Sequence, residues 1–213
     1  MNWSRYGPNA LLFRFADGIG DESFATSLAI TKELERNPPE GMVEFVPAFT
    51  TVLVTFDTRE RVLRTADQLL RRLARCATGK IVPAPVKEIP VTYNGPDLNR
   101  VAELHKLTTE EVAEVHAATT YKVYMLGFSP GFPYLGDLDS RLHTPRLASP
   151  RTRVAAGSVA IGGSHTGIYS VDSPGGWNII GHTNLKLFDS TGDGAEMFFL
   201  RQGDRVRFVP QHG

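Results

Sequence analysis

Apolar positions in the first 93 residues follow two periods, one typical of strands and one typical of helices. Leu11, Phe13 and Phe15 alternate with polar or small residues, whereas Val62, Ala66 and the leucines after them recur at helical spacing. These patterns predict strands at 11–15, 42–46, 52–56 and 86–93, a helix at 21–35 capped by Asp21, and a second helix capped by Asp57 or Thr58. The βαββαβ order is the ferredoxin-like pattern, so we expect a small α+β domain over residues 1–93.

The remaining chain divides into a helical and a β-rich part. Asp97 is a candidate N-cap, and Thr108 with Glu111 forms a capping-box pattern, so residues 94–117 are expected to form a helical connector. From residue 118 onward the pattern returns to period two, with turn residues between short segments. Expected strands lie at 122–125, 158–161, 167–171, 177–182, 185–188, 197–200 and 206–209. Such a series predicts an all-β barrel or sandwich over residues 118–213.

Composition narrows the class of protein. Among the 213 residues, 23 Lys and Arg balance 23 Asp and Glu, so the net charge favours neither nucleic acid nor an anionic membrane as a partner. No apolar run approaches the roughly 20 residues of a membrane helix, and the N-terminus lacks the apolar core of a signal peptide. The single cysteine, Cys76, excludes an internal disulfide. Together these features predict a soluble cytoplasmic protein.

The segment 127–131 (GFSPG) matches the G-x-S-x-G elbow of serine hydrolases, but the match is rejected. In that elbow the residue after the serine opens a helix and donates its backbone N–H to the oxyanion. Here that residue is Pro130, which has no N–H, and nothing helical follows. Ser129 is therefore interpreted as a loop hydroxyl that binds or caps.

Glycines and aromatic residues alternate around the same segment. The glycines allow a close approach of the backbone, and the rings supply flat apolar walls. They are Gly127, Gly131, Gly136, Phe128, Phe132 and Tyr134. A second turn, formed by Pro174, Gly175 and Gly176, launches a strand with Trp177. These features predict a small-ligand pocket, and the alternative is a rigid aromatic corner that only packs the barrel.

Arg146, Arg151 and Arg153 lie in a proline-punctuated segment that holds the backbone extended. The guanidinium fork binds carboxylate and phosphate groups through two parallel hydrogen bonds, so these residues are candidate ligand contacts. The alternative is surface ion pairing with acids such as Asp137 and Asp139.

His165 and Tyr169 flank one expected strand and are the candidates for acid, base or hydrogen-bond donor. His116 and His182 lie near the ends of elements, where structural histidines are common. The histidine spacings match no metal pattern, and the chain has neither a P-loop nor a dinucleotide fingerprint. We therefore expect no metal held by this chain alone.

Five long motifs resemble the allophanate hydrolase subunit 1 family, whose bacterial members include the B component of 5-oxoprolinase and the sporulation kinase inhibitor KipI. The motifs are 127–135 (GFSPGFPYL), 144–146 (TPR), 149–154 (SPRTRV), 156–161 (AGSVAI) and 173–181 (SPGGWNIIG). The resemblance extends over essentially the full length. It implies a cyclophilin-like β-barrel after a small α+β domain, and a close partnership with a C subunit and an A subunit. Such complexes hydrolyse 5-oxo-L-proline to L-glutamate at the expense of ATP.

The leading hypothesis is therefore a B component of an ATP-dependent 5-oxoprolinase that is inactive alone, with His165 and Tyr169 as catalytic candidates. The candidate substrate contacts for a small carboxylate are Phe128, Ser129, Gly131, Phe132, Arg146, Arg151, Arg153, Gly175, Gly176 and Trp177. One alternative is a KipI-like inhibitor that binds a histidine kinase. Another is a carboxyltransferase-like subunit acting on urea or allophanate, which would need a separate biotin carrier because this chain has no biotin-carrier lysine motif.

Overall fold

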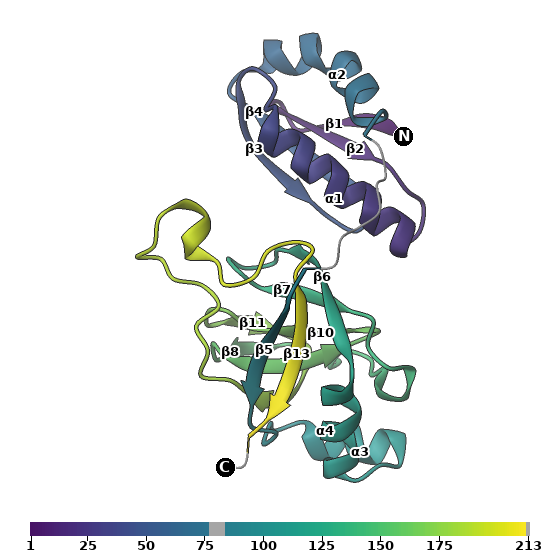
Figure 1. Ribbon diagram of the computed structural model, residues 1–213, viewed down its shortest axis with the longest axis vertical. Coiled ribbons are helices and arrows are strands. Elements are labelled where there is room, and N and C mark those ends of the chain that lie inside the picture. The colour runs from purple at the N-terminus through teal and green to yellow at the C-terminus, as the bar shows by residue number, and fades with distance from the viewer. Residues whose placement is uncertain (77–83, 212–213) are drawn as a thin grey trace. The chain divides into compact units, whose positions relative to one another are not determined.

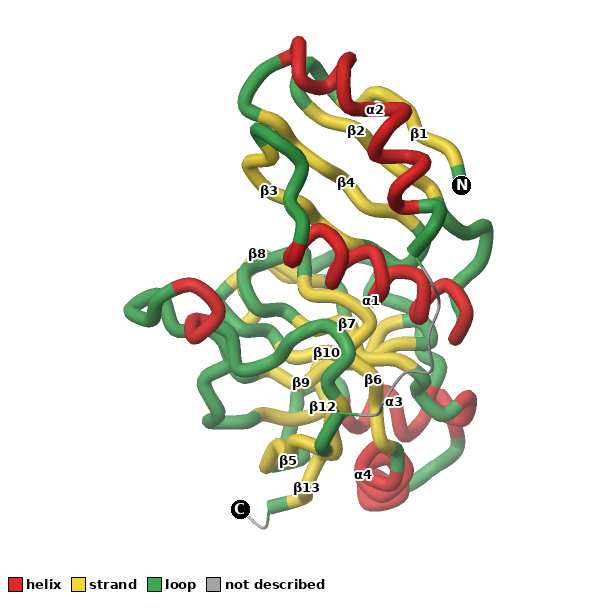
Figure 2. The backbone as a smooth tube through the Cα atoms, turned by 45° about the horizontal axis from the view of Figure 1, so that its top comes forward, coloured by secondary structure: helices red, strands yellow, loops and turns green. Residues whose placement is uncertain are grey.

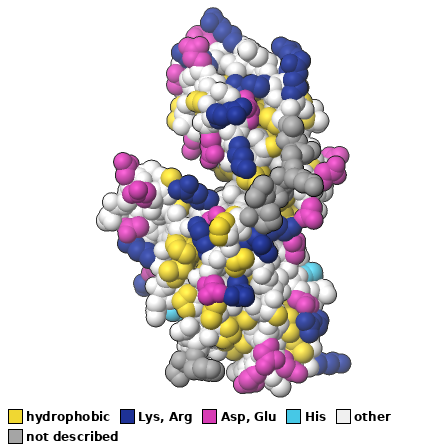
Figure 3. Space-filling view, in the orientation of Figure 1, with side chains coloured by type: hydrophobic (Ala, Val, Ile, Leu, Met, Phe, Trp, Pro, Cys, Tyr) yellow, Lys and Arg dark blue, Asp and Glu magenta, His cyan; other side chains and the backbone are white. Residues whose placement is uncertain are grey.

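The computed structural model describes residues 1–76 and 84–211, and the chain divides into two compact units, Met1–Val82 and Pro83–Gly213 (Figure 1). Each unit has its own buried apolar cluster. On the face drawn in Figure 3, Lys and Arg side chains are interspersed with Asp and Glu in both units, in keeping with the zero net charge. None of the helices within the described ranges is long and apolar enough to cross a membrane.

The first unit is an antiparallel sheet covered by two helices (Figure 2). Its elements are β1 (Asn2–Tyr6), β2 (Ala10–Arg14), α1 (Asp21–Arg36), β3 (Met42–Pro47), β4 (Thr51–Phe56) and α2 (Arg59–Leu73). Alternation turns the apolar residues of β2 and β4 to one face, where both helices pack against them. This core contains Leu11, Phe13, Val52, Val54, Phe56, Ile30, Leu34, Val62, Ala66 and Leu69. Gly20 precedes α1 in the cap position expected for Asp21, and Thr58 caps α2 with its hydroxyl.

The ferredoxin-like order expected for the first unit is not confirmed. The strand order is β1-β2-β4-β3, and β1 forms a hairpin with β2. The strand expected as the last of this domain, β5 (Val86–Val91), instead pairs in parallel along its whole length with β13 (Arg205–Pro210) of the second unit. The boundary expected at residue 93 therefore lies inside the second unit. β1 was not predicted because it has no alternating apolar face: only Trp3 within it is partly buried.

The second unit is a curled sheet accompanied by a few helices. Its further elements are α3 (Leu98–His105), α4 (Thr109–Ala118), β6 (Thr120–Leu126), β7 (Pro133–Gly136), β8 (Arg151–Val154), β9 (Ser158–Gly162), β10 (His165–Ile168), β11 (Ser173–Gly175) and β12 (Asn178–His182). The strand order is β12-β9-β10-β7-β6-β13-β5, and β11 pairs separately with β8. Just beyond β5, Thr92 and His182 exchange two backbone hydrogen bonds of 2.9 Å, so the two edges of the curled sheet meet.

The expected connector, residues 94–117, is part of the second unit. Val101 of α3 and Val112 of α4 are fully buried in the same core as the sheet. The capping box is confirmed, because the Thr108 hydroxyl accepts from Glu111 N at 3.1 Å while the Glu111 carboxylate accepts from Thr108 N at 2.7 Å. α3 and α4 therefore pack on the sheet and do not separate two domains.

Two expected strands are wrong. Segments 185–188 and 197–200 form no ladder, and only a single bridge joins Phe188 to Phe198. Between them the chain forms a short 3-10 helix, Gly194–Met197, in a loop that stands off from the sheet in Figure 1. β7, β8 and β11 were not expected, because they are short and lie among prolines that obscure the two-residue period.

A fully buried histidine links α4 to the sheet. His116 Nδ1 lies 2.7 Å from the Tyr93 hydroxyl, and its Nε2 lies 2.8 Å from Thr166 Oγ1. The Thr166 hydroxyl donates to the Ala160 carbonyl at 3.0 Å, so its oxygen accepts from Nε2–H and leaves Nδ1 to accept from Tyr93. Burial lowers the pKa of His116 to about 3, which keeps the ring neutral. The expectation that His116 is structural is confirmed.

We predict that this histidine makes the second unit sensitive to acid. The unfolded chain binds a proton at the ordinary histidine pKa near 6.5 while the folded chain does so only near 3, so stability is complete above pH 6.5 and falls as the pH decreases. The free energy of unfolding should fall by about 2 kcal/mol more between pH 7 and pH 5 in the native chain than in His116→Gln. Urea denaturation of both chains in a Trp3→Phe background, followed by Trp177 fluorescence, measures it. An equal loss in both chains would contradict the assignment.

Candidate functional site

Phe132 is the centre of an aromatic cluster in the second unit. Its ring centroid lies 5.2 Å from those of Tyr134 and Tyr169, and 5.5 Å from those of Phe128 and Trp177. The interplanar angles of 67° to 85° are edge-to-face arrangements, which aromatic quadrupoles favour. Phe132 is only 2% exposed. The five rings therefore hold one another in fixed orientations.

Glycines supply the space that three of these rings occupy. A Cβ at Gly162 would lie 2.8 Å from the Trp177 ring, and one at Gly167 would lie 2.9 Å from Phe132 Cζ. A Cβ at Gly175 would lie 2.0 Å from the Tyr169 hydroxyl. Real Cβ atoms do not approach other atoms so closely, so each position requires glycine. The rings pack directly on the backbone of β9, β10 and β11.

The aromatic cluster encloses a small hollow of about 80 Å³. Its lining residues are Phe128, Phe132, Tyr134, Arg146, Tyr169, Gly175, Gly176 and Trp177. Arg146 Cζ lies 5.7 Å from the centroid of the Trp177 ring, a cation–π distance, so one positive charge stands on an aromatic wall. We call this cavity the aromatic hollow.

Phe128 covers the aromatic hollow from an unusual backbone conformation. Its φ is +67°, a region that a bulky residue rarely adopts, and 61% of its surface is exposed. The turn is closed by a 2.8 Å hydrogen bond from Ser129 N to the Gly127 carbonyl, and β7 follows it in place of a helix. The rejection of a serine-hydrolase elbow is therefore confirmed. Strain at an exposed ring beside a cavity is typical of binding sites.

Several expected site residues lie outside the aromatic hollow. Ser129 and Gly131 are not among its lining residues, and Gly131 instead packs against Phe188. Arg153 is 79% exposed in its side chain and pairs with Asp172. Arg151 binds the buried carboxylate of Asp97 at 2.7 Å. For these two arginines the ion-pairing alternative describes the structure, although with acids other than those expected.

The two catalytic candidates are not on the same wall. Tyr169 lines the aromatic hollow, whereas His165 does not and instead contacts the Tyr124 ring, with centroids 6.4 Å apart. Burial lowers the pKa of His165, and the nearby Asp137 carboxylate opposes this shift. Burial raises the pKa of Tyr169, while a hydrogen bond with the Trp177 backbone and the charge of Arg146 oppose it. Burial also raises the pKa of Tyr134. Both phenols are therefore neutral hydrogen-bonding groups at neutral pH.

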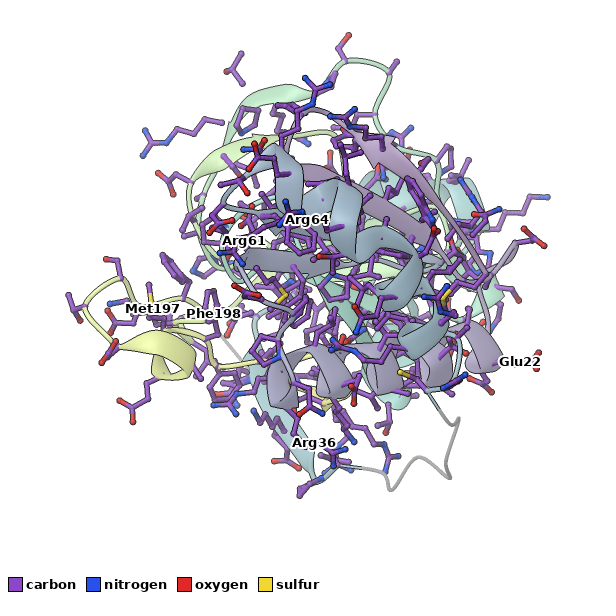
Figure 4. All side chains as sticks on the ribbon, turned by 90° about the horizontal axis from the view of Figure 1, so that it is seen from above. Glu22, Arg36, Arg61, Arg64, Met197 and Phe198 are labelled. Carbon is purple, nitrogen blue, oxygen red and sulfur yellow. The ribbon has the colours of Figure 1, made fainter. Side chains whose placement is uncertain are left out.

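A larger hollow of about 280 Å³ in the first unit is a weaker candidate for a ligand site. It is lined by Glu40, Thr58, Glu60, Arg61, Arg64 and Thr65, and Figure 4 labels two of its arginines. The Arg61 guanidinium is already bound by Glu40 and Asp57, and the lining is polar and open to solvent. Within the described residues, no group of three or more His, Cys, Asp or Glu side chains is placed to hold a metal ion. The aromatic hollow is therefore the better candidate site.

Comparison with known proteins gives a consistent set of relatives. The family model described as carboxyltransferase domain, subdomain C and D, matches residues 1–198. The B component of 5-oxoprolinase from Bacillus subtilis is 39% identical over 220 residues, covering 95% of this chain and 90% of the relative. The corresponding 5-oxoprolinase component of Escherichia coli O157:H7 is 46% identical, covering 80% and 79%. The crystal structure of TTHA0988 superposes with a TM-score of 0.85 at 39% identity, and the chain covers only 40% of that longer protein.

We predict that Gly175→Ala is destabilising, because its Cβ would overlap the Tyr169 hydroxyl. Overpacking of this kind costs about 1–3 kcal/mol of unfolding free energy. The matched control is Gly176→Ala, whose Cβ would meet only Pro150 atoms at 3.6–3.7 Å, an ordinary contact. Urea denaturation of both variants measures the difference. Equal stabilities would mean that the glycine is not required by the ring above it.

Proposed function

The chain belongs to the family of the carboxyltransferase domain, subdomains C and D, and on that premise we propose that it is the B component of a cytoplasmic 5-oxoprolinase. Relatives that match most of this chain carry that name. The proposed reaction adds water across the lactam bond of 5-oxo-L-proline and yields L-glutamate. We propose that it requires ATP and the partner A and C components, and that this chain is inactive alone.

One observation carries the assignment of the site: a guanidinium stands on the wall of an aromatic hollow that has no acidic lining residue among those described. 5-Oxoproline combines a flat ring with a carboxylate, so it matches aromatic walls beside one cation. Arg146 binds the carboxylate in this proposal, because its fork matches the geometry of that group. The neutral phenols of Tyr134 and Tyr169 orient the bound group through hydrogen bonds.

The size of the aromatic hollow supports a shared site. A hollow of about 80 Å³ is small for a whole substrate, which supports a site completed by walls from a partner. Pockets for drug-sized ligands are roughly 300–1000 Å³, so ATP does not fit here. We propose that a partner binds the nucleotide, and we derive no step through ATP on this chain. We also propose that the curled sheet is a cyclophilin-like β-barrel.

A carboxyltransferase role is the second candidate, and the family description favours it. Relatives that match most of the chain are nevertheless named for 5-oxoprolinase, so hydrolysis is the leading proposal. Turnover of urea by a complex supplied with a biotin carrier would distinguish the two. The kinase-inhibitor alternative stays a hypothesis, to be tested by measuring binding to a histidine kinase dimerisation domain.

We predict that Arg146→Gln lowers 5-oxoproline turnover in a complex reconstituted with the A and C components. Loss of a hydrogen bond to a charged group costs about 1.5–3 kcal/mol, or roughly ten- to a hundredfold in kcat/KM. The matched control is Arg207→Gln, which removes an exposed guanidinium that pairs with Glu88 and does not line the aromatic hollow. Assembly of each complex is checked by size-exclusion chromatography.

Two outcomes would contradict the proposal in different ways. Full turnover by the Arg146→Gln complex would remove the aromatic hollow from the reaction. Full turnover by the A and C components without this chain would remove the proposed function itself.

A further inference from the structure

The turn before α3 is bonded tightly to the strand that follows Trp177. Asp97 is 5% exposed, and its Oδ2 accepts a 2.7 Å hydrogen bond from Ile179 N. Its own backbone N–H donates to the Ile179 carbonyl at 3.0 Å. A Cβ at Gly95 would lie 2.3 Å from that same carbonyl, so the turn approaches β12 as closely as glycine allows. Asp97 thus anchors β12 although it was expected only to cap a helix.

The other oxygen of the same carboxylate holds a second segment. Asp97 Oδ1 accepts from Arg151 Nη2 at 2.7 Å, and Arg151 lies directly opposite Gly175 in the β8–β11 pair. Gly175 lines the aromatic hollow and packs against the Tyr169 hydroxyl. Arg151 is also close enough to Tyr169 for its charge to act on the pKa of that phenol. One buried carboxylate therefore connects β12 with β8, the strand that pairs with β11 and its Gly175.

The first turn of α3 provides a further connection to the site. Arg100 Nη1 donates to Asn178 Oδ1 at 2.8 Å, and the fully buried Asn178 donates through Nδ2 to the Pro145 carbonyl at 3.0 Å. Pro145 immediately precedes Arg146, the cation of the aromatic hollow. The peptide that carries Arg146 is thus held by β12, and β12 is held by α3.

We propose that Asp97 and Arg151 are a positioning pair that fixes the Gly175–Trp177 wall of the aromatic hollow, with Arg100 in a supporting role. Arg151 acts through the wall and does not itself contact the substrate. The catalytic part of this inference rests on the proposed function, whereas its geometric part does not. A carboxylate with both oxygens engaged holds β8 and β12 in one relative position, and the rigid guanidinium of Arg151 sets the direction of its Nη2 hydrogen bond more narrowly than a flexible lysine would.

The geometric part is tested by the fluorescence of Trp177. Trp3 is the only other tryptophan and contacts Asp67 in the first unit, so Trp3→Phe leaves Trp177 as the single reporter. In that background, Asp97→Asn and Arg151→Lys should each raise the acrylamide quenching constant of Trp177 about twofold, because the wall opens more often. Arg151→Lys keeps the charge and is the milder change should Asp97→Asn fail to fold.

The matched control is the ion pair between Glu88 and Arg207, which lies in the same unit with both side chains about half exposed. Glu88→Gln and Arg207→Lys should leave the quenching of Trp177 unchanged. Unchanged quenching in folded Arg151→Lys would overturn the positioning role. A rise in the control variants equal to that in Arg151→Lys would overturn it as well, because it would indicate a general loosening.

Turnover in the reconstituted complex tests the catalytic part. Arg151→Lys should raise the KM for 5-oxoproline about tenfold while the complex still assembles, because a wall displaced by a fraction of an ångström misplaces Arg146. If the quenching of Trp177 rises but the KM stays unchanged in both Arg151→Lys and Arg146→Gln, the geometric pair stands and the proposed site fails. If Arg146→Gln alone changes the KM, the site stands and the positioning role in catalysis is overturned.

Discussion

Phe132 makes edge-to-face contacts with four other rings, and the second unit is arranged so that these contacts fit. Three of these rings lie so close to the backbone beneath them that the positions they cover must carry no side chain. Gly162, Gly167 and Gly175 meet that condition on three different strands. The glycine content of the segment is therefore a packing requirement, and the aromatic hollow is the space that remains where the rings and glycines do not completely fill the wall.

The lining of the aromatic hollow carries a positive charge but no negative charge among the described residues. The lining contains one guanidinium and two phenols whose pKa is raised by burial, while the buried carboxylate of Asp97 is not part of the lining and bonds to Arg151 and Ile179. This separation leaves the charge of Arg146 uncompensated by acids within the described lining. The negative charge of Asp97 is taken up by Arg151 and by the N–H of Ile179, which limits the cost of burying it.

The sequence predicted elements that bury one face and missed those that do not. α2 and β4 carry clear periods because each has a single apolar face, whereas β1 is almost wholly exposed and β11 contains only three residues, one of them proline. The aromatic walls, Arg146 and the second glycine turn were identified because those residue types have few other reasons to occur together. The direction of Arg151 could not be inferred, because its partner lies 54 residues away and looked like a helix cap. Likewise, the sequence of β5 predicts a strand but does not indicate that its partner is β13.

The pairing of β5 with β13 also constrains when the second unit can fold. Glu88 and Arg207, which face each other across this pair, are separated by 119 positions, and the meeting of Thr92 with His182 depends on strands made in between. Contacts so distant along the chain close slowly, since the loop entropy is lost before the contacts form. During synthesis β13 must emerge from the ribosome before β5 has its partner. The curled sheet can therefore be completed only once β13 has been synthesised, and until then the edge of β5 lacks its partner strand, a state that favours aggregation.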